Sequence, residues 1–289
     1  MKRNSTKNCG LRICDFGFNK SEIGNPKSEI LYEDNHIIAV NKRASALSQG
    51  DRTGDTSLDS EVRKYIAAKY NKPGEVFLGV VHRLDRPVSG VILYARTGKS
   101  LQRLNEMFRK GEVRKHYLAI VKERPPEESA TILHYLKKNE KQNKTFVYDT
   151  QVKGSKEATL TYTLKGRSDR YYLIEVELHT GRHHQIRAQL AKIGCPVKGD
   201  LKYGYPRSNK DGSISLISRR IEFIHPVRKE KMVITAPFPD GDIWEEFNYK
   251  EDIPIPQPSR SAKATRDRLF PAPQGRGLNN SILTRPEKS

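Results

Sequence analysis

The chain has 289 residues, enough for one or two domains with a real hydrophobic core. Lys and Arg number 53 against 34 Asp and Glu, a formal net charge of +19. This excess favours nucleic acid or another anionic surface as partner, although a merely soluble basic protein stays an alternative. No apolar run is long enough to cross a membrane and no signal peptide is recognisable, so we expect a cytoplasmic protein with no membrane partner.

Two polar segments flank the part of the chain that carries apolar periodicity. Residues 1–29 predict a polar N-terminal arm, and residues 249–289, rich in Pro, Ser and Arg, predict a disordered basic tail. Residues 30–248 are left as one folded domain. Most of the positive charge belongs to this domain, because each flank has only a small excess of basic residues.

The folded part predicts strands and helices in mixed order. Apolar spacing and turn residues indicate a hairpin over residues 30–42, a helix over 58–69, two strands from the stretch 80–96 and a helix over 101–108. Further on they indicate strands over 113–121, 158–166 and 171–180, a helix over 183–194 and a last hairpin from 218–226 and 231–239. Successive strands with few helices between them predict an α+β fold, a mixed, largely antiparallel central sheet with flanking helices.

No motif in the chain indicates a metal or a cofactor. Cys9, Cys14 and Cys195 are an odd number without zinc spacing, so we expect neither disulfides nor a zinc site. The pair His179 and His183 lacks a neighbouring carboxylate. Residues 93–100 end like a phosphate-binding loop but begin with Leu where that loop needs Gly.

The stretch VVHRLDRPVSGVILYAR, residues 80–96, places one carboxylate among cations. Asp85 lies between His82, Arg83 and Arg86, with apolar runs on both sides. A buried carboxylate is unfavourable unless it is paired. Asp85 is therefore either a turn residue with arginine neighbours by accident, or a carboxylate held ionised for chemistry.

A second segment offers a partner for this carboxylate. In the helix that begins near Arg182, the side chains of Arg182, Gln185 and Gln189 share one side, while Arg187 borders the apolar stripe. A partly buried arginine needs a carboxylate, so pairing Arg187 with Asp85 satisfies both groups. The alternative is an Arg187 on an exposed edge.

Three separated motifs carry a family resemblance. HRLDRPVSG, RKHYLAIV and TGRHHQIRAQLAKIGCPVKGDLKYG, in this order, resemble the RluA-type family of RNA pseudouridine synthases over about Ile30 to Pro239. The resemblance implies the pseudouridine synthase fold with an RNA-binding cleft. It also implies cofactor-free isomerisation of specific uridines in ribosomal or transfer RNA, and we expect a monomer.

The resemblance assigns roles to individual residues. Asp85 becomes the catalytic aspartate, Arg187 its ion-pair partner and Tyr117 the aromatic residue against a target base flipped out of its stack. Arg83 would help to displace the flipped nucleotide. The expected RNA contacts are Arg83, His82, Arg86, Arg182, His184 and Gln185.

Two rival functions stay open at this point. One is a non-catalytic RNA-binding protein, which loss of Asp85, Tyr117 or Arg187 would have favoured. The other is an N-glycoside hydrolase, which would normally need a second carboxylate to activate water. Val88 departs from the family pattern, and so do Arg43, Ala44 and Ser45, which affects loop detail rather than the proposed pair.

Overall fold

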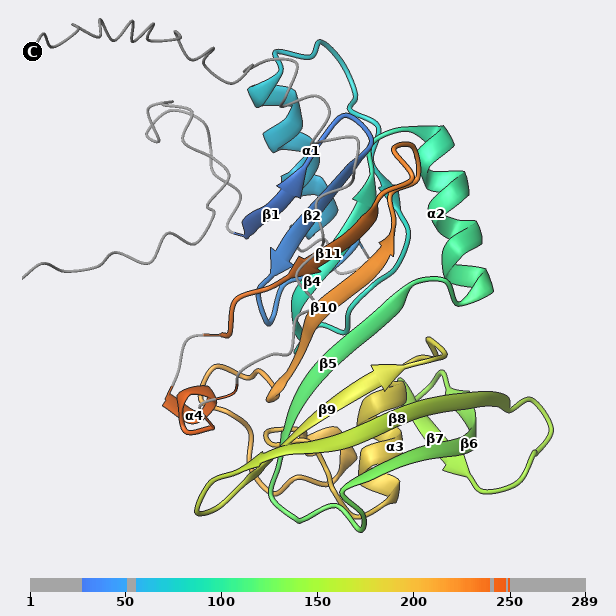
Figure 1. The fold of residues 1–289 in the computed structure, drawn as a ribbon, viewed down its shortest axis with the longest axis vertical. Coiled ribbons are helices and arrows are strands. Elements are labelled where there is room, and N and C mark those ends of the chain that lie inside the picture. The colour runs from blue at the N-terminus through green and yellow to red at the C-terminus, as the bar shows by residue number, and fades with distance from the viewer. Residues whose placement is uncertain (1–27, 51–55, 240–241, 248, 250–289) are drawn as a thin grey trace, which may run out of the picture. The chain divides into compact units, whose positions relative to one another are not determined.

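The computed structural model of the chain describes residues 28–50, 56–239, 242–247 and 249 (Figure 1). The predicted N-terminal arm, residues 1–29, and the predicted tail, residues 249–289, lie outside the described residues except for their innermost positions. The first half of the described chain contains β1 (Glu29–Glu33), β2 (Ile37–Lys42), α1 (Leu58–Lys69), β3 (Gly79–Val80), β4 (Ser89–Ala95), α2 (Gly98–Lys110) and β5 (Arg114–Val121). The second half contains β6 (Ser129–Asn139), β7 (Lys144–Tyr148), β8 (Lys156–Arg167), β9 (Tyr172–Leu178), α3 (Gln185–Lys192), a 3-10 turn (Leu201–Tyr203), β10 (Leu216–Ile224), β11 (Lys231–Thr235) and α4 (Asp242–Glu245).

The described strands form one mixed sheet. Its order is β1-β2-β4-β10-β5-β9-β8-β6-β7, with β11 beside β10 and β3 beside β4. Of these pairings only β4 with β10 is parallel, and the others are antiparallel. The predicted mixed, largely antiparallel sheet with flanking helices is confirmed.

Two details differ from the sequence prediction. The stretch 80–96 was expected to give two strands, but the first, β3, has only two residues, and the chain then runs as a loop to β4. The hairpin of β6 and β7 was not predicted (Figure 1). Several apolar side chains of this hairpin, including Leu133, Phe146 and Tyr148, are exposed, so its pattern is not the usual alternation of buried and exposed residues.

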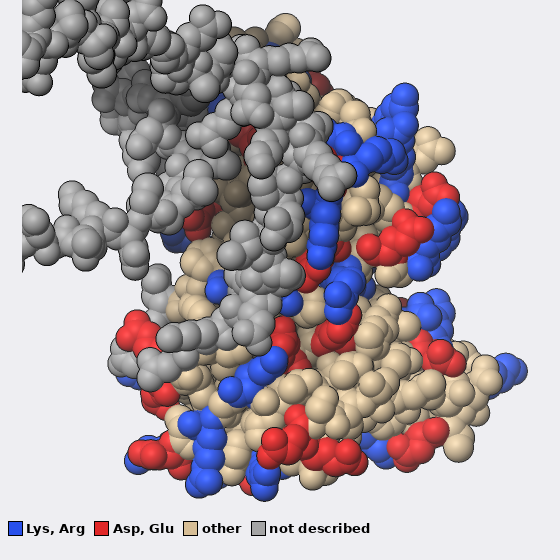
Figure 2. Space-filling view, viewed as in Figure 1, with Lys and Arg blue, Asp and Glu red and all other residues tan. Residues whose placement is uncertain are grey.

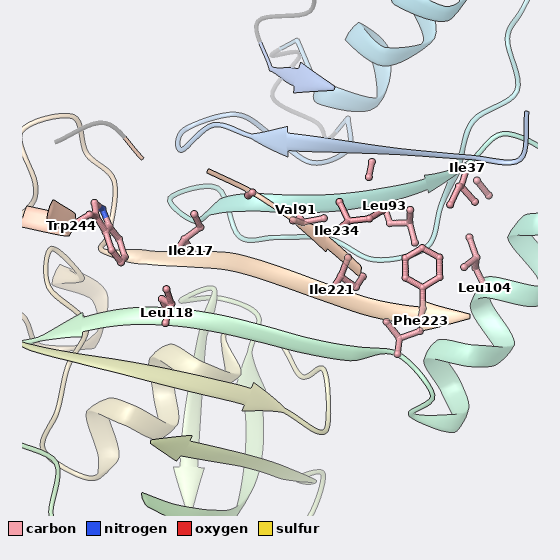
Figure 3. Close-up of a cluster of buried hydrophobic side chains, with 14 of the residues drawn as sticks. Ile37, Val91, Leu93, Leu104, Leu118, Ile217, Ile221, Phe223, Ile234 and Trp244 are labelled. Carbon is pink, nitrogen blue, oxygen red and sulfur yellow. The ribbon is translucent and has the colours of Figure 1, made fainter. Parts of the chain in front are cut away.

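Three buried clusters hold the helices on the sheet. α1 packs Leu58, Val62 and Ile66 against one face of β2 and β4. α2 places Leu104 on the opposite face, in the cluster with Leu93, Ile221, Phe223 and Trp244 that Figure 3 shows. α3 packs on β5, β8 and β9 in a third cluster. Because β2 is covered on both faces, its residues 37–40 are all apolar and fully buried.

The ends of α2 follow ordinary capping rules. The hydroxyl of Thr97 accepts a hydrogen bond from the backbone N–H of Ser100 at 3.2 Å, and Gly111 closes the helix with φ 73°. The helix α2 contains the basic residues Lys99, Arg103, Arg109 and Lys110, and Figure 2 shows both basic and acidic side chains on the surface in this region. Among the described residues, no helix has the length and apolar character needed to span a bilayer.

Candidate active site

The loop between β3 and β4 carries Asp85 at a tight turn. The backbone N–H of Val88 donates to the carbonyl of Asp85 at 3.1 Å. The ammonium of Lys42, at the end of β2, donates to the carbonyls of Arg43, Arg86 and Val88 at 3.0, 3.1 and 2.7 Å. Lys42 is fully buried, and burial lowers its pKa to about 7 although the charge of Asp85 opposes the shift. Lys42 therefore fixes the backbone that follows Asp85 in the loop.

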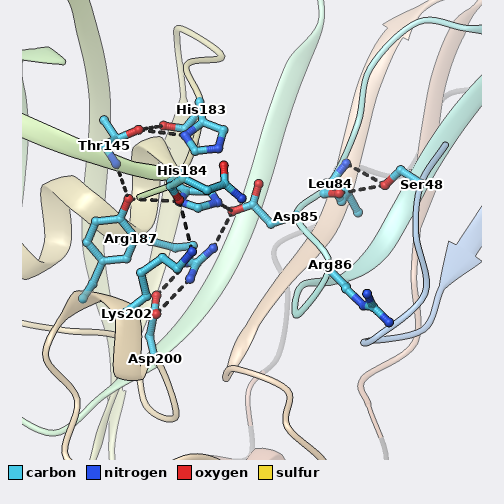
Figure 4. Close-up of polar contacts among 12 residues, drawn as sticks. Ser48, Leu84, Asp85, Arg86, Thr145, His183, His184, Arg187, Asp200 and Lys202 are labelled. Carbon is cyan, nitrogen blue, oxygen red and sulfur yellow. Dashed lines mark hydrogen bonds and ion pairs between the residues drawn. The ribbon is translucent and has the colours of Figure 1, made fainter. Parts of the chain in front are cut away.

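A serine fixes the backbone that precedes Asp85 in the same loop. The hydroxyl of Ser48 donates to the carbonyl of Leu84 at 2.7 Å, and the Leu84 N–H donates back to that hydroxyl at 3.1 Å (Figure 4). The residue before Asp85 is thus held in both directions by a buried side chain. Together with Lys42, this contact holds the catalytic candidate on a rigid turn, as a reacting group requires.

Close backbone packing explains a glycine just after the loop. Gly90, with φ 112°, lies opposite Ser218 where β4 and β10 pair in parallel. A Cβ at this position would stand 2.2 Å from the Ser218 carbonyl oxygen. Only glycine permits this approach, which brings β10 beside the Asp85 loop.

Arg187 on α3 lies between two aspartates. Its NH1 donates to Asp85 Oδ2 at 3.0 Å, while Nε and NH2 donate to Asp200 at 2.7 and 2.9 Å (Figure 4). Arg187 is 5% exposed and its ring partner Tyr203 lies 5.1 Å below the guanidinium. Burial works against its charge, but the hydrogen bonds and charge of Asp200, with those of Asp85, outweigh it and raise the pKa of Arg187. The expected pairing of Arg187 with Asp85 is present.

The side chain of Asp85 is only partly covered. Its exposure is 26%, against 1% for Asp200. Both carboxylates share one guanidinium, but Asp200 receives two of its hydrogen bonds and Asp85 one. Asp200 is thus the structural anchor of Arg187, and Asp85 is the carboxylate that a substrate can reach.

Tyr117 on β5 lies in the same buried cluster as Leu84 and Val88, the neighbours of Asp85. Burial raises its pKa to about 12, with a contribution from the charge of Asp85 and against a hydrogen bond with Ser218. The ring is 7% exposed, so its contact with a target base stays a prediction.

Two of the predicted RNA contacts have their polar groups engaged inside the protein. His82 accepts a hydrogen bond from the Leu93 N–H at 2.9 Å and stacks on Phe108, and burial lowers its pKa to about 3. Gln185, 2% exposed, accepts from Thr180 and donates to a carbonyl of β8. This favours a structural role for both side chains over a direct contact with RNA.

The other predicted RNA contacts divide into exposed arginines and one buried histidine. Arg83, Arg86 and Arg182 are exposed. The Nε of Arg86 donates to the Ser45 carbonyl at 3.2 Å, and that of Arg182 to the Glu157 carbonyl at 2.9 Å. His184 is buried, with Nε2 3.6 Å from Asp85 Oδ2. It belongs with the catalytic candidates rather than with the surface.

Several site residues were missed in the sequence. Asp200 and Tyr203 follow α3 in the segment GDLKYG, and Thr145 lies on β7. Lys42 closes an apolar strand, which is an unusual place for a lysine and a signal that could have been used. Nothing in the sequence distinguishes Thr145 from the other threonines.

The described residues offer no cluster of three or more His, Cys, Asp or Glu placed to hold a metal ion. What the site has is a partly exposed carboxylate, a buried arginine paired with it, and apolar side chains beside it. Such a carboxylate can act as a nucleophile or stabilise a developing cation.

Solved structures with the same fold were found. Human RNA pseudouridylate synthase domain containing 4 superposes with a TM-score of 0.61 at 20% identity, covering 73% of this chain and 88% of that one. Human RNA pseudouridylate synthase domain containing 1 gives 0.60 at 19% identity, covering 89% and 100%. These matches define the fold as that of the pseudouridine synthases.

Sequence matches define the family. Residues 36–192 match the RNA pseudouridylate synthase family. The ribosomal large subunit pseudouridine synthase C of Buchnera aphidicola subsp. Acyrthosiphon pisum is 30% identical over 83% of this chain and 76% of its own length. The protein of the same name from Rickettsia prowazekii is 35% identical over 61% of this chain, which spans only 56% of that relative. The tRNA pseudouridine synthase C of Vibrio parahaemolyticus is 28% identical over 78% and 97%. The chain belongs to the RNA pseudouridylate synthase family.

Proposed function

We propose that this protein isomerises specific uridines to pseudouridine in ribosomal or transfer RNA, with Asp85 as the catalytic carboxylate. The observation that carries the proposal is the 3.0 Å contact of Asp85 with a buried arginine that a second aspartate already holds in place. Arg187 pairs with Asp85 and holds it in place, and Tyr117 supports the base. The named activities of the Buchnera, Rickettsia and Vibrio relatives support the choice of RNA classes.

The RNA is bound by the basic surface around the loop, with Arg83, Arg86 and Arg182 as the exposed cations that contact it. The net charge of +19 supports this, because phosphate contacts supply much of the affinity for RNA. Arg83 also displaces the flipped nucleotide. We further propose that the protein acts as a cytoplasmic monomer without a cofactor.

The geometry disfavours the hydrolase alternative. A glycoside hydrolase needs a second carboxylate to activate water, and the carboxylate nearest to the pair is Asp200. Both oxygens of Asp200 accept hydrogen bonds from Arg187, and its side chain is 1% exposed. It is therefore not free to act on water.

The experiment is to incubate unmodified ribosomal and transfer RNA with the purified protein and to map pseudouridine by chemical probing. New pseudouridines at defined positions support the proposal. Released uracil without pseudouridine would show a hydrolase, and bound but unchanged RNA would show a non-catalytic binder.

A further inference from the structure

Two stacked imidazoles lie beside Asp85. The ring centroids of His183 and His184 are 3.7 Å apart, and His184 is held in the left-handed backbone region, φ 51°, directly before α3 (Figure 4). A residue other than glycine rarely adopts this conformation, so the turn fixes the ring of His184 against the site. The hydrogen bonds around the ring decide which nitrogen carries its proton.

Tyr203 determines that choice. The backbone N–H of Thr145 can only donate, and it lies 2.9 Å from the Tyr203 hydroxyl oxygen. The hydroxyl oxygen is then an acceptor, and its own proton points to the acceptor within reach, His184 Nδ1 at 3.0 Å. Nδ1 is therefore unprotonated, and in the neutral ring the proton is on Nε2.

The same threonine fixes the second imidazole. Its hydroxyl donates to the carbonyl of His183 at 2.9 Å, so the hydroxyl oxygen accepts from His183 Nδ1–H at 2.8 Å. Thr145 thus sets opposite tautomers in the two stacked rings. Its backbone N–H acts on His184 through Tyr203, and its hydroxyl oxygen accepts the proton of His183 Nδ1.

Burial and surrounding charges keep His184 neutral. Burial is the main cause that lowers its pKa to about 2, and the charges of Arg187, His183, Lys202 and Lys138 act in the same direction. Asp85 is the carboxylate that faces it, across 3.6 Å. The ring does not titrate in the physiological range. It therefore does not act as a pH switch, and its effect on Asp85 comes from the direction of its N–H group.

The two oxygens of Asp85 are consequently unlike. Arg187 NH1 lies 3.0 Å and His184 Nε2 3.6 Å from Oδ2. Among the described residues, Oδ1 has no hydrogen-bond or ion-pair partner. The distance of 3.6 Å is longer than a hydrogen bond, but the Nε2–H dipole still attracts Oδ2. In the other tautomer the lone pair of Nε2 would face Oδ2 and repel it.

We propose that His184 is a positioning residue for the reaction: held as the Nε2–H tautomer by Thr145 and Tyr203, it attracts Oδ2 of Asp85, the oxygen that Arg187 binds, and so presents Oδ1 to the uridine. The inference rests on the proposed function, since it names the oxygen that reacts. Oδ1 is the atom that attacks or that faces the developing cation.

The principal test is Tyr203→Phe, which removes the hydroxyl and keeps the ring beneath Arg187. Single-turnover pseudouridine formation should slow by about 10- to 100-fold, the effect of a misplaced reacting group, while RNA affinity stays within about 2-fold. Tyr162→Phe is the control, because Tyr162 is also a buried tyrosine, in the cluster beneath α3, and no hydrogen bond or ring contact joins it to His184. It should behave as wild type.

A matched pair of variants separates position from structure. His184→Gln and His184→Leu place side chains without a branch at Cβ in the same backbone conformation, but the Gln amide can still donate towards Oδ2. The Gln variant should form pseudouridine at least about 10-fold faster than the Leu variant, with equal RNA affinity. Equal rates would overturn the proposal. If the Leu variant does not fold, the rates of His184→Gln and Tyr203→Phe, together with the 15N NMR spectrum of His184, decide whether the proposal holds.

The tautomer can be read directly in the wild-type protein. Long-range 15N NMR of 15N-histidine-labelled protein should show His184 as the Nε2–H form, and Tyr203→Phe should lose that fixed state. A wild-type His184 protonated on Nδ1, or Tyr203→Phe with unchanged turnover, overturns the inference even if pseudouridine forms. Absence of pseudouridine with the wild-type protein would instead refute the proposed function.

Discussion

Substituting Arg187 should destabilise the protein more than substituting its buried partner Asp200. Arg187→Met leaves Asp200 as a buried carboxylate, 1% exposed, whose oxygens have no other side-chain donor among the described residues. Breaking a buried pair in this way costs about 3–5 kcal/mol. Asp200→Asn leaves Arg187 with Asp85 at 3.0 Å and with the Asn oxygen, so its cost should be nearer to 1–3 kcal/mol, roughly that of weakened hydrogen bonds.

Urea unfolding at pH 7 measures both free energies. Arg114→Met is the control, since its pair with Glu177 is exposed and should change stability by less than about 1 kcal/mol. The double variant Arg187→Met with Asp200→Leu should recover most of the loss, because no unpaired charge is then buried. An Asp200→Asn protein as unstable as Arg187→Met would refute the assignment of Asp200 as the anchor and Asp85 as the exposed partner.

Three further predictions follow from the backbone, the histidines and the tail. Gly90→Ala should destabilise the protein by about 3 kcal/mol or more, since its Cβ meets the backbone of β10, whereas Gly98→Ala, with open space around it, should change thermal stability little. Stability should be full above about pH 6.5 and should fall as pH drops below it, because His184 and His82, with folded pKa values of about 2 and about 3, stay neutral while their unfolded forms protonate. Melting measured as a function of pH checks this, and a flat profile between about pH 6.5 and 5 contradicts it. Removing residues 251–289, which include seven Lys and Arg, should weaken RNA binding and flatten its salt dependence, measured by filter binding; an unchanged salt slope argues against phosphate contacts there.

Much of the site could be predicted because two buried charges needed each other. Asp85 stands between apolar runs and Arg187 borders an apolar helix face, so pairing them required no knowledge of the fold. Asp200 was missed because its loop, thirteen residues beyond Arg187, shows no periodicity that would indicate burial. The sequence indicated a carboxylate for Arg187 but not that two would share it.

The fold was predictable where apolar periodicity follows burial. The helices α1, α2 and α3 and the hairpin of β1 and β2 lie where spacing placed them. The hairpin of β6 and β7 was missed because exposed side chains such as Leu133 and Phe146 break the pattern. The segment before Asp85 was expected to be a full strand, because its apolar residues, which serve two clusters rather than one face, resemble a buried strand. Tertiary contacts of this kind are invisible to local periodicity.

Asp85→Asn tests the central claim most directly. Asn has nearly the shape of Asp but no charge, so the variant removes the reacting anion and keeps the turn that Lys42 and Ser48 hold. Folding, RNA affinity and pseudouridine formation should be measured on one preparation beside wild type. The account predicts a folded protein that binds RNA at least as tightly, since a negative charge is lost, and forms no detectable pseudouridine. A folded Asp85→Asn protein that still converts uridine to pseudouridine would contradict it.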